Sequence, residues 1–266
     1  MAQWRSTIAR LLLHGGRMAD RATRATTYLA AGTRRLEEMY ADHTRTWDRF
    51  YQAHPAQETR LLPWEEVCLG RFVPGGAKVL LIGCGSGRDL VALVERGCEV
   101  TGIDPSAEAL KIAERLLSAR GRSAKLIRGF FESTAVPHPS DVVIFSYYCY
   151  AAIPMTSRRV AALKKAAAHL NPGGHVMVSH AAGVRPPRSI LVRAGRFAGA
   201  LTRSDWRIEA GDLLSADSRE PPPSLSFTHV FEPGELEREA AAANLRVVLR
   251  HVAEDDNTVV AVLTHP

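Results

Sequence analysis

Three glycines stand on alternate positions directly after an apolar run, and this spacing is suited to binding a polar ligand. The stretch KVLLIGCGSGRDL spans residues 78–90 and contains Gly83, Gly85 and Gly87. A glycine backbone turns sharply and lets a ligand approach closely, and the first N–H groups of a following helix are free to bind it. The stretch therefore predicts a strand, a tight turn and a helix start around a ligand site.

A carboxylate follows at the distance that a nucleoside site requires. Asp104 ends the apolar run CEVTGID, 17 residues after Gly87. A doubly wound sheet places an acidic residue at about this point, where it accepts the hydroxyls of a ribose. The two segments together predict a ligand with a nucleoside part. The alternative is a turn with a structural role only, in which Asp104 caps the next helix.

The fourth position of the turn distinguishes two classes of nucleoside site. Dinucleotide folds have G-x-G-x-x-G or G-x-G-x-x-A, but Arg88 stands here in place of the small residue and the glycines fall as G-x-G-x-G. This spacing resembles the glycine loop of the class I S-adenosylmethionine-dependent methyltransferases. Later segments resemble that family in the same order: GIDPS from 102, DVVIFSYYCY from 141, HLNPGGHVMVSH from 169, and the closing run from FEPGELEREA at 231 to the C-terminus.

The resemblance covers roughly residues 51–266 and has one departure. The family usually has an acidic residue two positions before the first glycine, where this chain has Leu81. That carboxylate normally helps to hold the loop and the methionine end of the cofactor. Its loss implies weaker binding, a substitute contact from elsewhere, or a chain without activity that serves as a cofactor-binding or scaffold protein.

The resemblance also implies which residues bind S-adenosylmethionine. The glycine turn would cradle the methionine and ribose, Asp104 would accept both ribose hydroxyls, and the two residues after it would border the adenine. Two phenylalanines after the third strand stand beside the adenine region with Glu132, or are core residues, and the end of the fourth strand faces the methyl group. The full set is Gly83, Cys84, Gly85, Ser86, Gly87, Asp104, Pro105, Ser106, Phe130, Phe131, Ser146 and Tyr147.

Residues for the methyl acceptor are expected after the fourth and fifth strands. Tyr148 and Tyr150 would touch the acceptor, and His180 is the best-placed general base, with His229 second. The alternative for each of these residues is a structural role in packing or at the surface. The N/D-P-P-Y/F run of base-modifying relatives does not occur here, which disfavours a nucleic-acid acceptor, while the tyrosines favour an aromatic or apolar one.

Alternating apolar runs and helical patterns predict an α/β fold with a parallel sheet. The family resemblance implies that it is a Rossmann-like, doubly wound seven-stranded sheet whose last strand is antiparallel. The expected domains are a helical basic extension over 1–60 and a methyltransferase domain over 61–266, with a lid insertion at 181–230. Expected strands are 78–82, 99–103, 125–128, 141–146, 174–179, 245–251 and 257–263, and expected helices are 88–96, 106–119, 157–170 and 234–243.

The N-terminal arm holds the chain's positive charge. Residues 1–35 contain seven arginines against Asp20 alone, whereas the whole chain has a formal net charge of +6. The arm reads as a helix interrupted at Gly15-Gly16 and a second one from Met18 to Tyr51, with a break near Gly32. It is suited to covering the active site, to contact with an anionic membrane, or to an organellar or nucleic-acid role.

Composition limits the remaining classes. With 266 residues and 46% apolar residues, the chain is long enough for a packed globular core. Four scattered cysteines indicate neither zinc nor disulfides and favour a reducing cytosol, and no metal-binding histidine spacing occurs. The pair Arg158-Arg159 is predicted to lie on the solvated face of a helix.

The predicted function is methyl transfer to an O, N or S atom of a small organic molecule. The alternatives are a methyltransferase with a membrane lipid as acceptor and a protein that binds the cofactor without catalysis.

Overall fold

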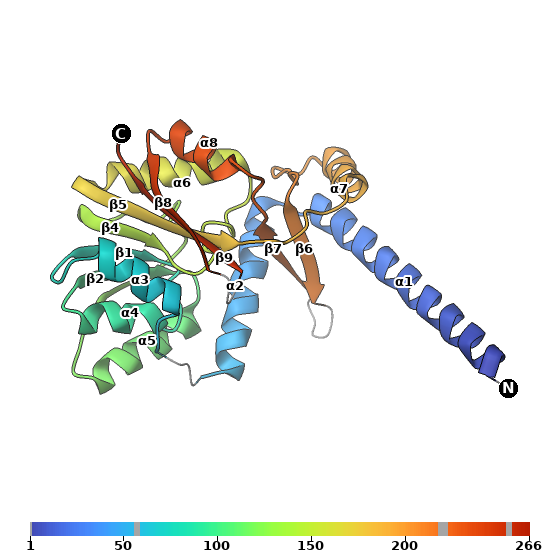
Figure 1. The fold of residues 1–266 in the computed structure, drawn as a ribbon, viewed down its shortest axis with the longest axis horizontal. Coiled ribbons are helices and arrows are strands. Elements are labelled where there is room, and N and C mark those ends of the chain that lie inside the picture. The colour runs from blue at the N-terminus through green and yellow to red at the C-terminus, as the bar shows by residue number, and fades with distance from the viewer. Residues whose placement is uncertain (1, 56–58, 218–222, 254–256) are drawn as a thin grey trace.

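A seven-stranded sheet forms the centre of the protein (Figure 1). The computed structural model describes residues 2–55, 59–217, 223–253 and 257–266. Strand order is β3-β2-β1-β4-β5-β9-β8; the first five are parallel and β9 is antiparallel to both neighbours. The predicted fold class is confirmed. The strands are β1 (Lys78–Ile82), β2 (Glu99–Asp104), β3 (Lys125–Arg128), β4 (Ser140–Phe145), β5 (Leu170–Ala181), β8 (Arg246–Ala253) and β9 (Thr258–Thr264).

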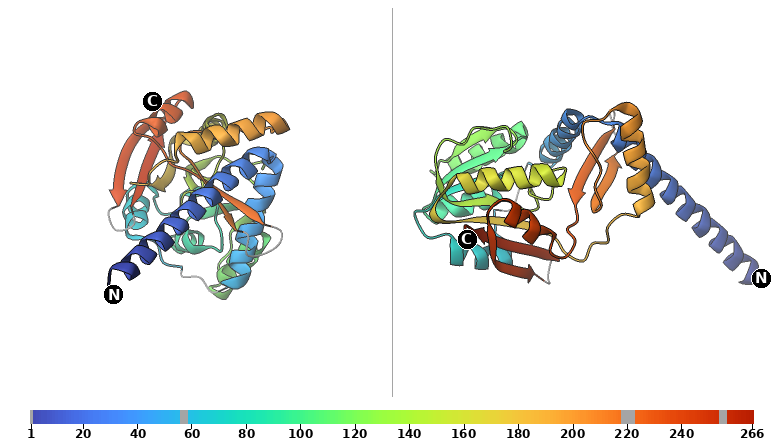
Figure 2. Two further views of the ribbon diagram at one scale, coloured as in Figure 1. Left: turned by 90° about the vertical axis from the view of Figure 1, so that its right-hand side faces the viewer. Right: turned by 90° about the horizontal axis from the view of Figure 1, so that it is seen from above.

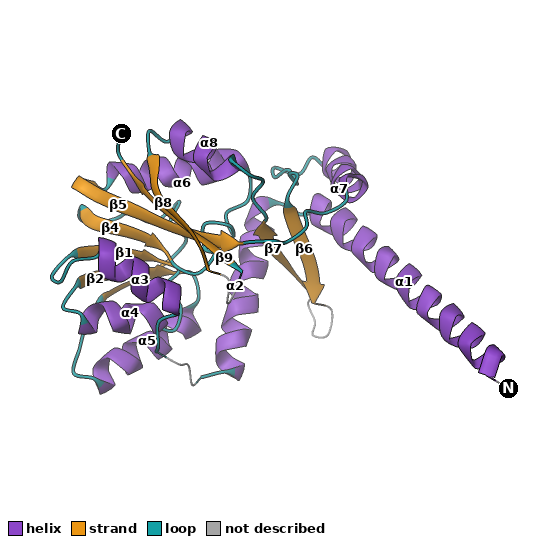
Figure 3. Ribbon diagram, in the orientation of Figure 1, coloured by secondary structure: helices purple, strands orange, loops and turns teal. Residues whose placement is uncertain are grey.

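Helices cover both faces of this sheet, which explains why the parallel strands are continuously apolar (Figure 3). Successive residues of β1 point to opposite sides, so Val79 and Leu81 belong to one core cluster and Leu80 to the other. The first cluster packs against α3 (Pro63–Phe72), α4 (Arg88–Glu95) and α5 (Ala107–Ala119). The second packs against α6 (Thr156–Ala168) and α8 (Glu235–Ala242).

Two helices precede the sheet, α1 (Ala2–Thr33) and α2 (Leu36–Ala53). The predicted interruption at Gly15-Gly16 is wrong, because α1 runs through both residues; the side chains of 1–15 lie outside the description. The real break falls just after Gly32. A Cβ at Gly32 would lie 2.0 Å from the Gly195 carbonyl oxygen, so glycine is needed there for close helix packing. The outer part of α1 projects away from the body (Figures 1 and 2).

The segment between β5 and α8 forms a small lobe with the end of α1. It contains α7 (Ser189–Thr202) and a two-stranded antiparallel sheet of β6 (Asp212–Asp217) and β7 (Ser224–His229). Tyr28, Val192 and Trp206 belong to its own buried cluster. This lobe occupies the predicted lid insertion, of which residues 218–222 lie outside the description. Among the described helices, none has the length and apolar character needed to cross a membrane.

Candidate active site

The glycine turn follows β1 as a compact loop with left-handed backbone. Gly83, Gly85 and Gly87 have φ of 73°, 53° and 99°, values that favour glycine over residues with a Cβ. The N–H of Gly83 donates to the Ile103 carbonyl oxygen at 2.7 Å, which ties the turn to the end of β2. Gly87 caps α4. The alternating spacing in the sequence therefore reflects three separate backbone requirements within one turn.

Asp104 lies directly beside this turn. Its carboxylate accepts the N–H of Gly85 at 2.9 Å and that of Ser106 at 2.8 Å, and its side chain is buried. Burial raises the pKa of Asp104 to about 6, although the two N–H donors oppose the rise. The sequence prediction that the turn and Asp104 form one site agrees with this geometry. In this structure the carboxylate holds the loop closed, so ribose hydroxyls would share it with backbone donors.

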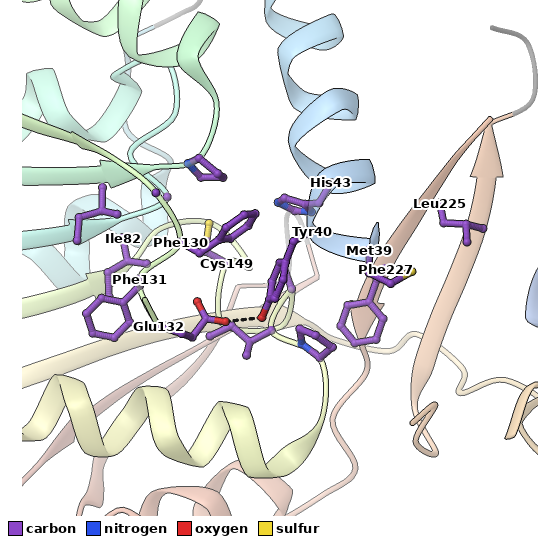
Figure 4. Close-up of a pocket in the computed structure, with 17 residues that line it drawn as sticks. Met39, Tyr40, His43, Ile82, Phe130, Phe131, Glu132, Cys149, Leu225 and Phe227 are labelled. Atoms are coloured by element: carbon purple, nitrogen blue, oxygen red, sulfur yellow. Dashed lines mark hydrogen bonds between the residues drawn. The ribbon is translucent and has the colours of Figure 1, made fainter. Parts of the chain in front are cut away.

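A pocket of about 720 Å³, its open mouth included, lies at the carboxyl edge of the sheet (Figure 4). Its wall combines the glycine turn, the ends of β2 and β3, the segment after β4, helix α2 and the strand β7. The lining residues include Gly83, Ile103, Pro105, Phe130, Phe131, Glu132, Cys149, Ile153, Met39, Tyr40, His43, Leu225 and Phe227.

Helix α2 forms one wall of the pocket, and the sequence analysis named none of its residues as site residues. Tyr40 and His43 point toward Phe130, with ring centroids 4.3 and 6.2 Å from it (Figure 4). Further along the same helix, Tyr51 reaches the turn, because a Cβ at Gly85 would lie 2.6 Å from its hydroxyl oxygen. The recurrence of rings at positions 40, 43, 47 and 51 is a helical stripe, and this was the signal available in the sequence.

Charged groups stand at the far side of this wall. The hydroxyl of Tyr40 donates to Glu132 at 2.6 Å and accepts from Arg158 at 3.1 Å. Arg158 also lies 3.5 Å from the Glu132 carboxylate. Burial, with the Glu132 charge, raises the pKa of Tyr40, so the phenol stays protonated. This network fixes the ring of Tyr40 in the pocket wall.

His43 is a neutral imidazole in the pocket wall. Burial lowers its pKa to about 4, and the Glu132 charge opposes this only in part. At neutral pH the ring therefore carries no charge and has a free lone pair to accept a proton. Among the histidines named from the sequence as bases, neither lies in the lining of this pocket.

The predicted adenine contacts divide between the pocket and the core. Pro105 and Phe130 line the pocket. Phe131 also borders it, but most of its ring packs on Phe145 in the core at 5.6 Å. Ser106 is fully buried, and its hydroxyl caps α5 by accepting the Ala109 N–H at 3.0 Å. Its residue type is explained by that cap without any ligand.

Ser146, just after β4, contacts a second carboxylate near the glycine turn, that of Asp89 at the start of α4. The Ser146 hydroxyl donates to Asp89 at 2.6 Å, and both side chains are buried. Burial raises the pKa of Asp89 despite the opposing charge of Arg88. Leu81, at the family's usual acidic position, is fully buried in the apolar core. The buried acid beside the turn is instead Asp89, two residues after Gly87 in the first turn of α4.

Three aromatic residues after Ser146 have different surroundings from those predicted. Tyr147 is 47% exposed and stacks on Tyr148 at 4.3 Å. It lines a smaller depression beside Asp89 and not the main pocket. The hydroxyl of Tyr148 hydrogen-bonds Thr258 at 2.7 Å. The prediction that Tyr150 touches the acceptor is wrong, because its side chain is fully buried and donates to Glu239.

The structure does not bring His180 into the main pocket. Its ring is buried against Phe231 at 4.7 Å, and its Nδ1 lies 3.0 Å from the Ala181 carbonyl oxygen. Burial lowers its pKa. The lining of the main pocket includes neither His180 nor Tyr148. Their predicted catalytic roles therefore find no support in the pocket geometry.

Arg159 is at the centre of a buried ion network, so the prediction that it lies on a solvated helix face is wrong. Its guanidinium is fully buried and lies 2.7 Å from Glu239, 3.4 Å from Glu235 and 3.5 Å from Glu209. This network joins α6 to α8 and to the lobe. The sequence pattern could not reveal it, because the acidic partners are 50 to 80 residues away.

His229 extends this network into the lobe. Its Nδ1 lies 2.7 Å from Asp212 and its Nε2 3.0 Å from Glu235. Burial by itself lowers the pKa of His229, but the two carboxylates outweigh it and raise the pKa. Within the described residues Glu209, Asp212 and His229 could together hold a cation, and Arg159 already supplies the positive charge there. The partners of His229 thus indicate a structural role, and His229 is not among the residues that line the main pocket.

The fold and the glycine turn are similar to those of Rossmann-like methyltransferases, as comparisons with known proteins show. Residues 79–174 match the family described as methyltransferase domain. A methyltransferase structure from Methanosarcina mazei superposes with a TM-score of 0.58 at 20% identity, over 77% of this chain and 98% of its own. A glycopeptide N-methyltransferase solved with sinefungin gives 0.57 at 17% identity, over 79% and 95%.

Relatives of known name match a shorter region. The ubiquinone biosynthesis O-methyltransferase of Idiomarina loihiensis is 31% identical over 139 residues, 51% of this chain and 55% of that protein. The cypemycin N-terminal methyltransferase of a Streptomyces species is 31% identical over 99 residues, 37% and 40%. The chain thus spans about half the length of the curated relatives it matches, or less. The match over residues 79–174 and the shared fold agree with the family resemblance that the sequence motifs show.

Proposed function

We propose that the chain is an S-adenosylmethionine-dependent methyltransferase that acts on a small organic molecule. The observation that carries this proposal is one continuous pocket. It joins the glycine turn and the end of β2 to an apolar chamber between α2 and β7. The first part suits a nucleoside cofactor and the second an acceptor, so both reactants would meet at the carboxyl edge of the sheet.

The residues present fit the proposed cofactor. Gly83 faces Cys149 so closely that a Cβ there would lie 2.0 Å from the Sγ, which leaves room in the turn only for glycine. Asp104 and Asp89 place two buried carboxylates beside the turn, an electronegative setting for a positively charged sulfonium. Bound here, S-adenosylmethionine would supply an electrophilic methyl group. Asp104 would hold the ribose, and Pro105 and Phe130 the adenine.

The acceptor part of the pocket favours an apolar or aromatic compound. Met39, Ile153, Leu225 and Phe227 form its wall, with Tyr40 and His43 as polar groups within it. Such a chamber excludes water and lets a few polar groups set the orientation of the ligand. Named relatives include a ubiquinone biosynthesis O-methyltransferase and a cypemycin N-terminal methyltransferase. We propose a hydroxyl or phenol acceptor, because a proton acceptor stands in the wall.

His43 is the proposed general base. As a neutral imidazole at pH 7 it can take the proton that the acceptor hydroxyl loses while its oxygen gains the methyl group. His180 is not among the residues that line this pocket. Positioning of the two reactants and exclusion of water would supply the rest of the acceleration.

The test of the proposed function is calorimetric titration of the purified chain. S-Adenosylmethionine and S-adenosylhomocysteine are expected to bind in the micromolar range, while a nicotinamide dinucleotide is not, because Arg88 stands where that cofactor needs a small residue. Binding of the first two ligands then justifies a screen of phenols and other apolar acceptors by methyl-transfer assay. Binding of neither would contradict the proposal and leave the scaffold alternative.

The role of His43 predicts a split between chemistry and binding. His43→Gln is expected to lower kcat by about 100-fold, the low end of the range for a general base because a pKa of about 4 makes His43 a weak one, and to leave the cofactor Kd within about twofold. The assay uses the acceptor that the screen returns. His180→Gln is the matched control and should keep kcat close to wild type. A large loss of kcat in His180→Gln with His43→Gln unaffected would instead support the sequence-based assignment.

A further inference from the structure

The outer face of α7 is an exposed apolar stripe. Ile190, Phe197 and Leu201 are 63%, 65% and 70% exposed, and they recur at positions i, i+7 and i+11 on one side of the helix. Single exposed apolar residues are ordinary on protein surfaces, but three large ones aligned on one helix indicate a contact surface. We call these three residues the α7 stripe.

The opposite side of α7 is firmly packed, so the stripe does not result from a loosely held helix. A Cβ at Gly195 would lie 2.7 Å from the Tyr28 carbonyl oxygen, which shows how closely α7 approaches α1. Trp206, just after α7, donates its indole N–H to the Ala31 carbonyl oxygen at 2.9 Å. The lobe therefore presents the stripe as a fixed surface.

Exposed arginines flank the stripe along α7. Residues 185–207 contain six arginines against Asp205 alone, and residues 1–35 contain seven against Asp20 alone. Since the whole chain has a net charge of only +6, the rest of the protein is net acidic and the positive charge gathers on α7 and α1. Arg188, Arg193 and Arg203 are exposed at the start, on the outer side and at the end of α7.

Apolar side chains flanked by arginines fit an anionic lipid surface better than they fit a nucleic acid or a second copy of this chain. Aliphatic side chains such as Ile190 and Leu201 neither stack on bases nor bind phosphates, so a nucleic acid would leave them unused. A second copy of this chain would bring arginines against arginines. A bilayer takes up apolar side chains at the depth of the headgroups while the guanidinium groups bind lipid phosphates.

We infer that the α7 stripe docks the protein on the surface of an anionic membrane. The same lobe carries Leu225 and Phe227, which line the main pocket, so docking would hold that pocket close to the lipid surface. An apolar acceptor dissolved in the membrane could then enter it. This last step rests on the proposed function, whereas docking itself needs neither cofactor nor turnover.

The test is sedimentation of the full chain with lipid vesicles. Wild type should sediment with vesicles of phosphatidylcholine and phosphatidylglycerol and only weakly with phosphatidylcholine alone. About 1 M salt, which shortens the screening length to about 3 Å, should weaken binding. The triple variant I190S/F197S/L201S should lose at least about tenfold in partition coefficient, because each apolar side chain contributes to insertion.

A matched triple variant controls for lost apolar surface in general. V67S/V248S/V252S removes three side chains that are 64%, 37% and 43% exposed elsewhere, and it should bind vesicles like wild type. Circular dichroism confirms that each variant is folded. Equal vesicle binding by I190S/F197S/L201S and wild type would overturn the inference. So would a dimer, or a complex with DNA or RNA, that the α7 variant alone abolishes. Retained binding of S-adenosylmethionine in that variant separates docking from the proposed function.

Discussion

Replacing Asp104 with alanine is expected to weaken S-adenosylmethionine binding by two to four orders of magnitude. The carboxylate would accept two ribose hydroxyls, and hydrogen bonds to a charged group contribute about 1.5 to 3 kcal/mol each, with about 1.4 kcal/mol for every tenfold in affinity. The loss should appear in calorimetric titration of Asp104→Ala. Because Asp104 also accepts the Gly85 and Ser106 N–H groups, the variant is expected to unfold at a somewhat lower temperature.

The matched control for Asp104→Ala is Asp141→Ala. Asp141 likewise accepts a backbone N–H, that of Lys78 at 2.8 Å, but it lies at the opposite end of β1 from the glycine turn. Its removal should leave cofactor affinity unchanged. Equal affinity in Asp104→Ala and wild type would rule out the ribose role.

The raised pKa of Asp104 adds a dependence on pH to the same experiment. Ribose hydroxyls donate to the ionised carboxylate, so binding favours the charged form of a group whose pKa is about 6. Affinity in the wild type should therefore be full above about pH 7 and fall as pH decreases through 6. The decrease should be missing in Asp104→Ala.

Replacing Arg159 with methionine is expected to be the most destabilising substitution among the charged residues described. The side chain is fully buried, and its removal would leave the buried carboxylate of Glu239 without a compensating charge. Breaking a buried ion pair in this way costs about 3 to 5 kcal/mol. Urea denaturation of Arg159→Met should show this loss of unfolding free energy.

Two further variants make this prediction specific. Arg250→Met removes an arginine whose side chain is 50% exposed and lies 4.0 Å from Glu237, and it should cost no more than about 1 kcal/mol. Arg159→Met/Glu239→Gln removes both signs of charge and should recover part of the lost stability. If Arg159→Met were as stable as Arg250→Met, the network would not hold the lobe to α6 and α8.

The cofactor half of the site was accessible from sequence because its signals are local. Gly83, Gly85 and Gly87 need backbone conformations that the residue type itself reveals, and Asp104 ends a recognisable strand. Parallel strands then bring those segments to one edge of the sheet, a consequence of topology that alternating apolar runs already predict. The antiparallel β9 was implied by the family resemblance of the closing run, whereas the order of the strands came only from the structure.

The acceptor half was beyond such reasoning because it depends on contacts between distant segments. His43 and Tyr40 lie within the helix predicted from Met18 to Tyr51, and only the packing of α2 over the sheet edge places them in the pocket. His180 had a favourable position in the sequence, yet its strand turns it toward Phe231.

The sequence by itself thus determined the sheet, the glycine turn and the position of Asp104, since apolar periodicity and backbone strain are properties of neighbouring residues. Tertiary structure alone decided that Arg159 is buried, that α2 closes the pocket and that the α7 stripe remains exposed. The physical reason is that a side chain's burial and charge state depend on which distant surface covers it. No local pattern encodes that choice.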